Sequence, residues 1–241
     1  MFDKFLADFK LNFINEDRWL SLVKGLLNTL EITFLALIIG VVIGILVAIV
    51  RSTYDKNKET MKKSGGAKYI ILKICNAVCS LYLTVIRGTP VVVQLMIAYF
   101  IIFASAKDGV MVAVFAFGIN SGAYVAEIFR SGILSVDNGQ FEAGRSLSFS
   151  YPKTMLYIII PQAFKTVLPT LCNEFIVLFK ETSVAGYVGV MDLTKAGDII
   201  RGRTFSAFMP LIAVALIYLF WVIILTALVK RLERRLRKNE R

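Results

Sequence analysis

The chain has 241 residues, of which 57% are hydrophobic and 19% charged, and its 28 lysines and arginines against 17 acidic residues give a net charge of +11. Soluble domains are usually less apolar and more charged, so this composition predicts a membrane protein. The sequence contains no histidine, which removes the usual general base and the commonest metal ligand and argues against most hydrolase chemistry.

Five apolar runs with few charges predict membrane-spanning helices, since about 20 apolar residues suffice to cross a bilayer. They lie near residues 25–50, 74–105, 110–133, 156–186 and 207–229. Only short loops remain between the runs, so no sizeable extramembrane domain fits. The predicted fold class is an all-α polytopic membrane protein with five transmembrane helices.

Two of the runs contain residues that interrupt helices. The run 74–105 is too long for a straight crossing and includes the tetrapeptide RGTP at 87–90. Because proline and glycine end or kink helices, we expect a cytoplasmic start, a break at this tetrapeptide and then the crossing proper. The run 156–186 is expected to be interrupted by Pro161 and Pro169.

Basic residues predict the orientation, because cytoplasmic loops carry an excess of lysine and arginine. Segment 51–73 holds seven basic residues against two acidic ones, and segment 230–241 again holds seven against two. Four runs separate these segments, so both can be cytoplasmic. The N-terminal segment, with four acids and four bases, then lies outside, and the C-terminus lies inside.

This orientation divides the chain into an external amphipathic segment at 1–24, a transmembrane domain at 25–229 and a basic cytoplasmic tail at 230–241. Phenylalanines recur at helical spacing in the first segment, which suits a helix lying along the outer membrane interface. The tail directly follows a span, so we interpret it as an anchor for anionic lipid and not as a nucleic-acid-binding arm.

The loop 134–155 falls in the cytoplasm under this orientation and has the features of a folded element. Asp137 and Asn138 suit a turn or a helix cap. A second helical start follows where Ser150 can cap and Pro152 suits the first turn. The pattern predicts two short helices at an angle that project below the membrane.

Within this loop, the small residues Ala143 and Gly144 permit close approach of a partner surface, to which Glu142 offers a fixed charge. With Ser148 and the segment Ile-Ile-Ile-Pro at 158–161, they resemble the EAA loop of ATP-binding-cassette (ABC) importer permeases. That pattern is Glu-Ala-Ala, three residues, Gly, nine residues, Ile, any residue, Leu-Pro. The sequence departs from it at Gly144 for Ala, Ser148 for Gly and Ile160 for Leu.

The rest of the chain, from about residue 20 to 229, narrows the resemblance to permeases for polar amino acids. The matching residues occur in that family's order: Gly25, Thr29-Leu30, Gly40, Gly44, Ala48, Arg51, Arg87-Gly88-Thr89-Pro90, Gln94-Leu95, Ala123-Tyr124, Glu127, Arg130, Gly139-Gln140, Pro161-Gln162-Ala163, Leu168-Pro169, Asn173, Lys180 and Thr182-Ser183. The resemblance implies the type I ABC importer permease fold and ATP-driven amino-acid import across a bacterial cytoplasmic membrane.

The chain contains no phosphate-binding G-x-x-x-x-G-K-[ST] loop, so the energy must come from another polypeptide. The resemblance implies two separate ATPase subunits that bind Mg-ATP, with Glu142, Ala143, Gly144 and Ser148 in the coupling helix that lies in a groove of one of them. It also implies an extracytoplasmic amino-acid-binding protein that delivers substrate. We expect no catalytic residue, cofactor or metal in this chain and therefore no enzymatic activity of its own.

Five spans are too few to enclose a pathway and leave no inverted second half. A second permease subunit, identical or related, is therefore expected to pair with this chain about a twofold axis. Whether that pair is a homodimer or a heterodimer stays open, as does the transported amino acid.

Charges deep in membrane spans are costly and point to function. Glu174 follows Asn173 near the middle of its run, where an unpaired carboxylate would cost several kcal/mol. One hypothesis is that both residues line the substrate path and bind the ammonium or side-chain cation of an amino acid, which favours basic or other polar substrates. The alternative is an internal ion pair of Glu174 with Arg87 or Lys180.

The break at 87–90 supplies two further candidates for the substrate path, Arg87 and Thr89, because freed backbone groups are tolerated in membranes mainly where they line a cavity or are satisfied by neighbours. Arg87 either meets a substrate carboxylate or latches the cytoplasmic end of its span. Glu127 and Arg130 lie one turn apart near the inner edge and are expected to pair or to snorkel.

A secondary amino acid carrier is the alternative interpretation, since it would also have basic cytoplasmic loops and isolated intramembrane charges. An EAA-like loop has no purpose in such a carrier. A membrane-embedded enzyme is a poorer candidate, because the sequence offers no histidine, no metal cluster and no carboxylates paired within one span.

Overall fold

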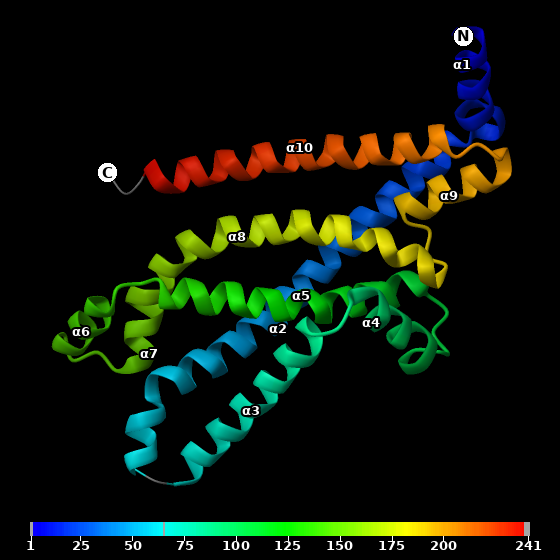
Figure 1. The fold of residues 1–241 in the computed structure, drawn as a ribbon. Helices are drawn as coiled ribbons and strands as arrows, with labels where there is room; N and C mark the ends of the chain where they lie inside the picture. The colour runs from blue at the N-terminus through cyan, green and yellow to red at the C-terminus, as the bar shows by residue number, and fades with distance from the viewer. Residues whose placement is uncertain (1, 65, 239–241) are drawn as a thin grey trace. The chain divides into compact units, whose positions relative to one another are not determined.

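The structure, a computed structural model, describes residues 2–64 and 66–238, which form helices and turns with no strand in those ranges (Figure 1). Among these described residues, five helical stretches are long and apolar enough to cross a membrane: Trp19–Lys56, Ala67–Arg87, Gly109–Leu134, Tyr151–Val188 and Phe208–Leu236. The predicted all-α fold with five crossings is therefore confirmed.

The N-terminal segment is helical and is fastened to a distant part of the chain. It comprises α1 (Phe2–Phe9), the π-helical turn η1 (Lys10–Ile14) and the 3-10 turn η2 (Asn15–Asp17), ahead of α2 (Trp19–Ser64). The fully buried Asn12 accepts a 2.8 Å hydrogen bond from the Thr204 hydroxyl. An exposed apolar face remains on α1, as its amphipathic pattern predicts.

The break expected at 87–90 is present, but the crossing precedes it. The first helix of this run, α3 (Ala67–Arg87), ends at Gly88, and Pro90 precedes α4 (Val91–Ile97) and the π-helical turn η3 (Ala98–Ile102). The 21 residues of α3 suffice to span a bilayer, whereas the apolar helix after the break is too short. The prediction that the crossing proper follows the break is therefore wrong.

The long stretch after α5 (Gly109–Leu134) is irregular at one of the two prolines expected to interrupt it. It contains α6 (Asn138–Ser146), α7 (Tyr151–Thr154), the π-helical turn η4 (Met155–Ile159), α8 (Ile160–Glu181) and the 3-10 segment η5 (Thr182–Val188). Pro161 lies in the first turn of α8, directly after η4, so the predicted interruption is found there. Pro169 lies inside α8, which continues through it. The second predicted break is wrong, because a proline removes one backbone hydrogen bond and membrane helices tolerate that loss where neighbours compensate.

The chain closes with α9 (Leu193–Thr204) and α10 (Phe208–Lys238). Between them, Phe205 has a left-handed backbone with φ of 52° and is 96% exposed. The fifth predicted span, 207–229, is thus found as the first part of α10, which begins one residue later and carries on into the basic tail.

The helices form two compact units, each assembled from separated stretches of chain. One unit contains the chain up to Leu37 with Pro90–Gly118 and Phe175–Leu228. The other contains Ile38–Thr89 and Ile119–Glu174, with the chain from Val229. The loop 134–155, Glu174 and Arg87 belong to the second unit, and Asp192 belongs to the first.

Glycines let helices approach closely in the second unit. A Cβ atom on Gly44 of α2 would lie 2.5 Å from Cγ1 of Val125 on α5. A Cβ atom on Gly122 of α5 would lie 2.8 Å from the Tyr82 hydroxyl of α3. Both distances are shorter than van der Waals contact. Any residue with a Cβ atom at these positions would therefore push α5 away from α2 or α3.

Candidate functional site

The loop 134–155 contains the two short helices that the sequence predicts. Asp137 caps α6 by accepting a 2.7 Å hydrogen bond from the Gly139 N–H, as expected. A new helix, α7, begins at Tyr151 with Pro152 in its first turn, also as expected, although the Ser150 hydroxyl at its N-cap makes no capping hydrogen bond. Because α7 runs through η4 into α8, this loop is joined to a membrane span without a flexible connection.

The end of α6 explains why the EAA pattern has a glycine at the position of Ser148. The Phe149 N–H bonds to the Gly144 carbonyl at 3.0 Å, and the Ser148 N–H bonds to the Arg145 carbonyl at 2.8 Å. This is the Schellman motif, which places the residue after the C-cap in the left-handed region. Ser148 accordingly has φ of 58°, a conformation that costs a non-glycine residue about 1 kcal/mol.

Gly144 is buried inside the loop, where it packs against α7. A Cβ atom at this position would lie 2.6 Å from both Cγ2 and Oγ1 of Thr154 on α7. The glycine therefore lets α6 close against α7, and an alanine would force the two helices apart. Of the other residues expected to contact a partner, Glu142, Ala143 and Ser148 are all exposed.

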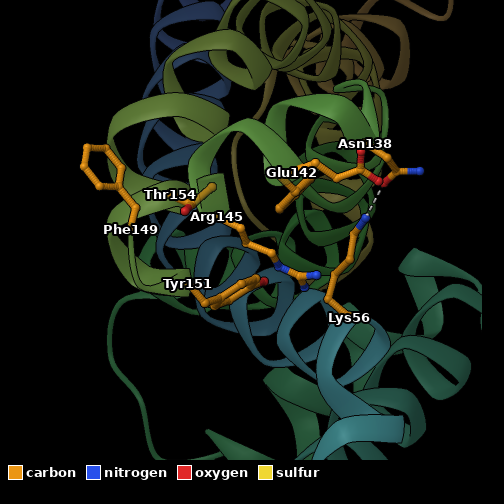
Figure 2. Close-up of a pocket in the computed structure, with 8 residues that line it drawn as sticks. Lys56, Asn138, Glu142, Arg145, Phe149, Tyr151 and Thr154 are labelled. Carbon is orange, nitrogen blue, oxygen red and sulfur yellow. Dashed lines mark hydrogen bonds between the residues drawn. The ribbon is translucent and has the colours of Figure 1, made fainter. Parts of the chain in front are cut away.

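A pocket of about 420 Å³ lies beside α6 (Figure 2). Its polar lining comes from α2, α6 and α7: Lys56, Asn138, Glu142, Arg145, Tyr151 and Thr154. In Figure 2, Arg145, Lys56 and Tyr151 extend toward the same space, whereas the Phe149 ring points away. A partner docked on α6 would meet both basic groups and the Glu142 carboxylate.

Two residues near the end of α2 hold the root of this loop. Lys56 donates a 2.8 Å hydrogen bond to Oδ1 of Asn138. Its neighbour Asp55 forms a 3.0 Å ion pair with Arg130 on α5, and Arg130 also pairs with Glu127 at 3.4 Å. The expected pairing of Glu127 with Arg130 is thus confirmed. Asp55 and Lys56 were not predicted, because a basic segment offers no signal for which of its charges is aimed at a partner.

Glu174, the carboxylate predicted to line the substrate path, lies on α8 and contacts α5. The hydroxyl of Ser121, which is 1% exposed, donates a 3.1 Å hydrogen bond to Oε1 of Glu174. The adjacent Asn173 is exposed and Glu174 is half-buried. Ser121 was not predicted, since one serine in an apolar run has no distinguishing spacing.

The two candidates at the break after α3 are placed differently. The Arg87 guanidinium carbon lies 5.6 Å from the centre of the Tyr124 ring on α5, within range of a cation–π contact. The Thr89 hydroxyl donates a 2.8 Å hydrogen bond to the Val85 carbonyl at the end of α3. All four predicted path residues, Arg87, Thr89, Asn173 and Glu174, belong to the same unit.

A second buried carboxylate, Asp192, was not predicted and lies at the start of α9. One of its oxygens caps the helix by accepting a 2.7 Å hydrogen bond from the Lys195 N–H, and Oδ2 has no hydrogen-bond partner among the described residues. Complete burial raises the pKa of Asp192 from 3.8 to about 6, against the opposing effect of the capping hydrogen bonds. An aspartate directly before a helical run is an N-cap signature that could have identified it.

The helix α2 packs directly on this carboxylate's backbone. A Cβ atom on Gly25 would lie 2.6 Å from the Asp192 carbonyl oxygen. The Thr29 hydroxyl accepts a 3.1 Å hydrogen bond from the Leu193 N–H. These contacts bind the start of α9 to the first crossing.

Within residues 2–64 and 66–238, no group of three or more cysteine or acidic side chains is positioned to hold a metal ion.

Residues 70–238 match the family described as the inner membrane component of binding-protein-dependent transport systems. Similar curated proteins include the glutamine transport system permease protein GlnP of Escherichia coli, 38% identical over 220 residues that cover 90% of this chain and 93% of that protein. Another is the arginine transport system permease protein ArtQ of Bacillus subtilis, 36% identical over 222 residues, with 91% and 94% covered.

Solved structures resemble the chain over most of its length. A crystal structure of an amino acid ABC transporter with histidines superposes with a TM-score of 0.79 at 39% identity, covering 92% of this chain and 98% of that one. An inward-facing structure of the methionine ABC transporter MetNI superposes with a TM-score of 0.73, covering 89% and 95%. At 19% identity, the second likeness concerns the fold alone.

Proposed function

Because the chain belongs to the inner membrane components of binding-protein-dependent transport systems, as the permease subunit of an amino acid ABC importer, we propose that α6 is its coupling helix. ATP hydrolysis takes place in a separate ATPase. Two ATPase subunits would bind Mg-ATP, and an external binding protein would supply the amino acid. The secondary-carrier alternative is not favoured by the family match.

The observation that carries this proposal is the rigid attachment of α6. A lever must transmit force without bending, and α6 is capped at its start by Asp137, closed at its end by a Schellman motif and packed through Gly144 onto Thr154. The helix after it continues into α8, a membrane span. A displacement of α6 would therefore move α8 rather than deform the loop.

The exposed surface of α6 indicates the chemistry of the partner. Glu142 and Arg145 are both exposed and lie on either side of the buried Gly144. Charge complementarity therefore favours an ATPase surface with a basic residue opposite Glu142 and an acidic residue opposite Arg145. A second permease subunit would complete the translocation path about a twofold axis.

We place α6 in the cytoplasm, with the N-terminus outside and the C-terminus inside. Support comes from the contact of Lys56 with Asn138, because Lys56 belongs to the basic segment 51–73 and so this segment and α6 are on one side of the membrane. An excess of basic residues is typical of the cytoplasmic side.

The side chains of Glu174 and Asn173 are proposed to line the substrate path, together with Arg87 and Thr89 at the break after α3. A half-buried carboxylate held by Ser121 suits the ammonium group that every amino acid carries, or the side-chain cation of a basic one. Relatives are named for transport of glutamine and arginine, so polar or basic amino acids are the proposed substrate class.

The role of α6 is tested by the charge reversal Glu142→Lys. We expect the ATPase subunits to copurify with this variant at least about tenfold less, because a like charge then faces the basic partner residue. The matched control is Glu59→Lys, which reverses another exposed acid, on α2. Full ATPase association and normal transport by Glu142→Lys would rule out α6 as the docking helix.

The role of Glu174 is tested by Glu174→Gln in transport assays with a panel of basic, neutral polar and acidic amino acids. Loss of the negative charge should weaken transport of basic substrates most, by about tenfold or more. Ser121→Ala tests the positioning hydrogen bond and should have a smaller effect in the same direction. Unchanged apparent affinity for every substrate would leave Glu174 only an internal ion pair.

A further inference from the structure

Two neighbouring residues of α2 contact both ends of the connection between α5 and α6. Asp55 pairs with Arg130, which lies one turn before the end of α5, at 3.0 Å. Lys56 donates its 2.8 Å hydrogen bond to Asn138, the first residue of α6. The cytoplasmic end of one helix therefore fixes the point where the transmembrane helix α5 turns into α6.

Lys56 also contacts the aromatic residue at the root of α6. Its Nζ lies 4.3 Å from the centre of the Phe141 ring, in the geometry of a cation–π interaction. Phe141 is 9% exposed and packs in a hydrophobic cluster with Ile133 of α5 and Ile159 of η4. The cation thus touches the residue that fixes α6 to the spans on both sides of it, and a movement of α6 must carry this ring with it.

A neighbouring charge of the same basic segment, Lys58, is not aimed in this way. Lys58 lies two residues further along α2, is exposed and makes no hydrogen bond or ion pair within the described part of the chain. A charge that only orients the chain in the membrane needs no specific partner, since its effect depends on which side it occupies. The directed contacts of Asp55 and Lys56 therefore require a second explanation.

We propose that Asp55 and Lys56 latch α2 to the α5–α6 connection, so that a displacement of α6 reaches the first membrane-spanning helix directly. Chain connectivity links α6 to α5 and α8, and the latch adds a route to α2, which is continuous for 46 residues. Lys56 is then a positioning residue for coupling that acts through Asn138 and Phe141. This inference rests on the proposed role of α6.

The test measures coupling, not only activity. The permease is purified with its ATPase subunits, reconstituted in proteoliposomes with liganded binding protein, and scored for amino acid transported per ATP hydrolysed. Lys56→Met keeps most of the stem and removes the charge and the donor, so the ratio should fall by roughly two- to fivefold. Lys56→Arg, which keeps both contacts possible, and Lys58→Met, the matched control, should retain the wild-type ratio.

A merely structural role for Lys56 would lower the yield and melting temperature of the complex and leave the ratio unchanged. Asn138→Ala removes the same hydrogen bond from the side of α6, and the double variant Lys56→Met/Asn138→Ala should lose no more coupling than Lys56→Met alone. A wild-type ratio in Lys56→Met refutes the latch. If Glu142→Lys still abolishes ATPase association in that case, the coupling role of α6 stands without the latch.

Discussion

Ser148 occupies the backbone conformation for which the EAA pattern has glycine. Its φ of 58° follows from the two hydrogen bonds that close α6, so the strain comes from the motif and not from the side chain. The pattern's glycine is therefore a local backbone requirement, which serine satisfies at a cost. At position 144 the pattern has alanine and this chain has glycine. Here only glycine fits, because Thr154 leaves no room for a Cβ atom.

Replacement of this serine by glycine is expected to stabilise the protein. Ser148→Gly should raise stability by about 0.5–1 kcal/mol, or roughly 2 °C in melting temperature, because glycine adopts the left-handed region without strain. Thermal unfolding of the purified permease checks the value. Ser148→Ala keeps the strain and is the control, so equal melting temperatures for the glycine and alanine variants would contradict this account.

Asp192 makes the stability of the start of α9 depend on pH. Its pKa is raised by burial from 3.8 to about 6, so the folded state favours the protonated form. The resulting contribution is fully present below about pH 4 and is lost as the pH rises through 6. Asp192→Asn cannot ionise, and the melting temperature of this variant relative to the wild type should therefore rise between pH 5 and pH 7.

The control for this pH dependence is Asp198→Asn on the same helix. A hydrogen bond from the Arg201 guanidinium lowers the pKa of the partly exposed Asp198, so this carboxylate stays ionised from pH 5 to pH 7. Its variant should differ from the wild type by the same amount across the range. A flat difference curve for Asp192→Asn, measured by thermal unfolding at several pH values, would show that Asp192 is ionised throughout.

At the scale of elements, helix existence follows from the sequence more directly than helix interruption. The five crossings and both short helices of the loop 134–155 were predicted, because long apolar runs and capping residues are local signals. The order of crossing and break in 74–105 was wrong, since the charged flank Lys68–Lys73 obscured a helix that begins at Ala67. Pro169 was taken as a break, yet only packing determines whether a proline ends a helix inside protein.

The contacts between elements were less predictable than the elements themselves. Ser121 beside Glu174 and Lys56 beside Asn138 join residues 53 and 82 positions apart, and no spacing rule relates such pairs. The burial of Gly144 likewise depends on Thr154, a residue on the next helix. The fold, and not spacing along the chain, decides which of these groups meet.

At the scale of the whole molecule, the number of crossings determines on which side of the membrane each loop lies. An odd number of crossings puts the two ends of the chain on opposite sides of the membrane, and five helices of the part of the chain that the structure describes are long and apolar enough to cross. The contact of Lys56 with Asn138 puts the basic segment 51–73 on the side of α6. One orientation measurement therefore tests the side of the ATPase, the side of the binding protein and the direction of import together.

That measurement is cysteine labelling in right-side-out membrane vesicles. The three native cysteines are free thiols, and a variant with all three replaced by serine gives the background for single cysteines at Asn15, Lys58 and Arg235, which are exposed. A membrane-impermeant maleimide should label the cysteine at 15 directly and those at 58 and 235 only after permeabilisation, because basic segments are retained in the cytoplasm. Direct labelling at 58 would place α6 outside and remove the coupling role proposed for it, whereas equal access at 15 and 235 would require an even number of crossings.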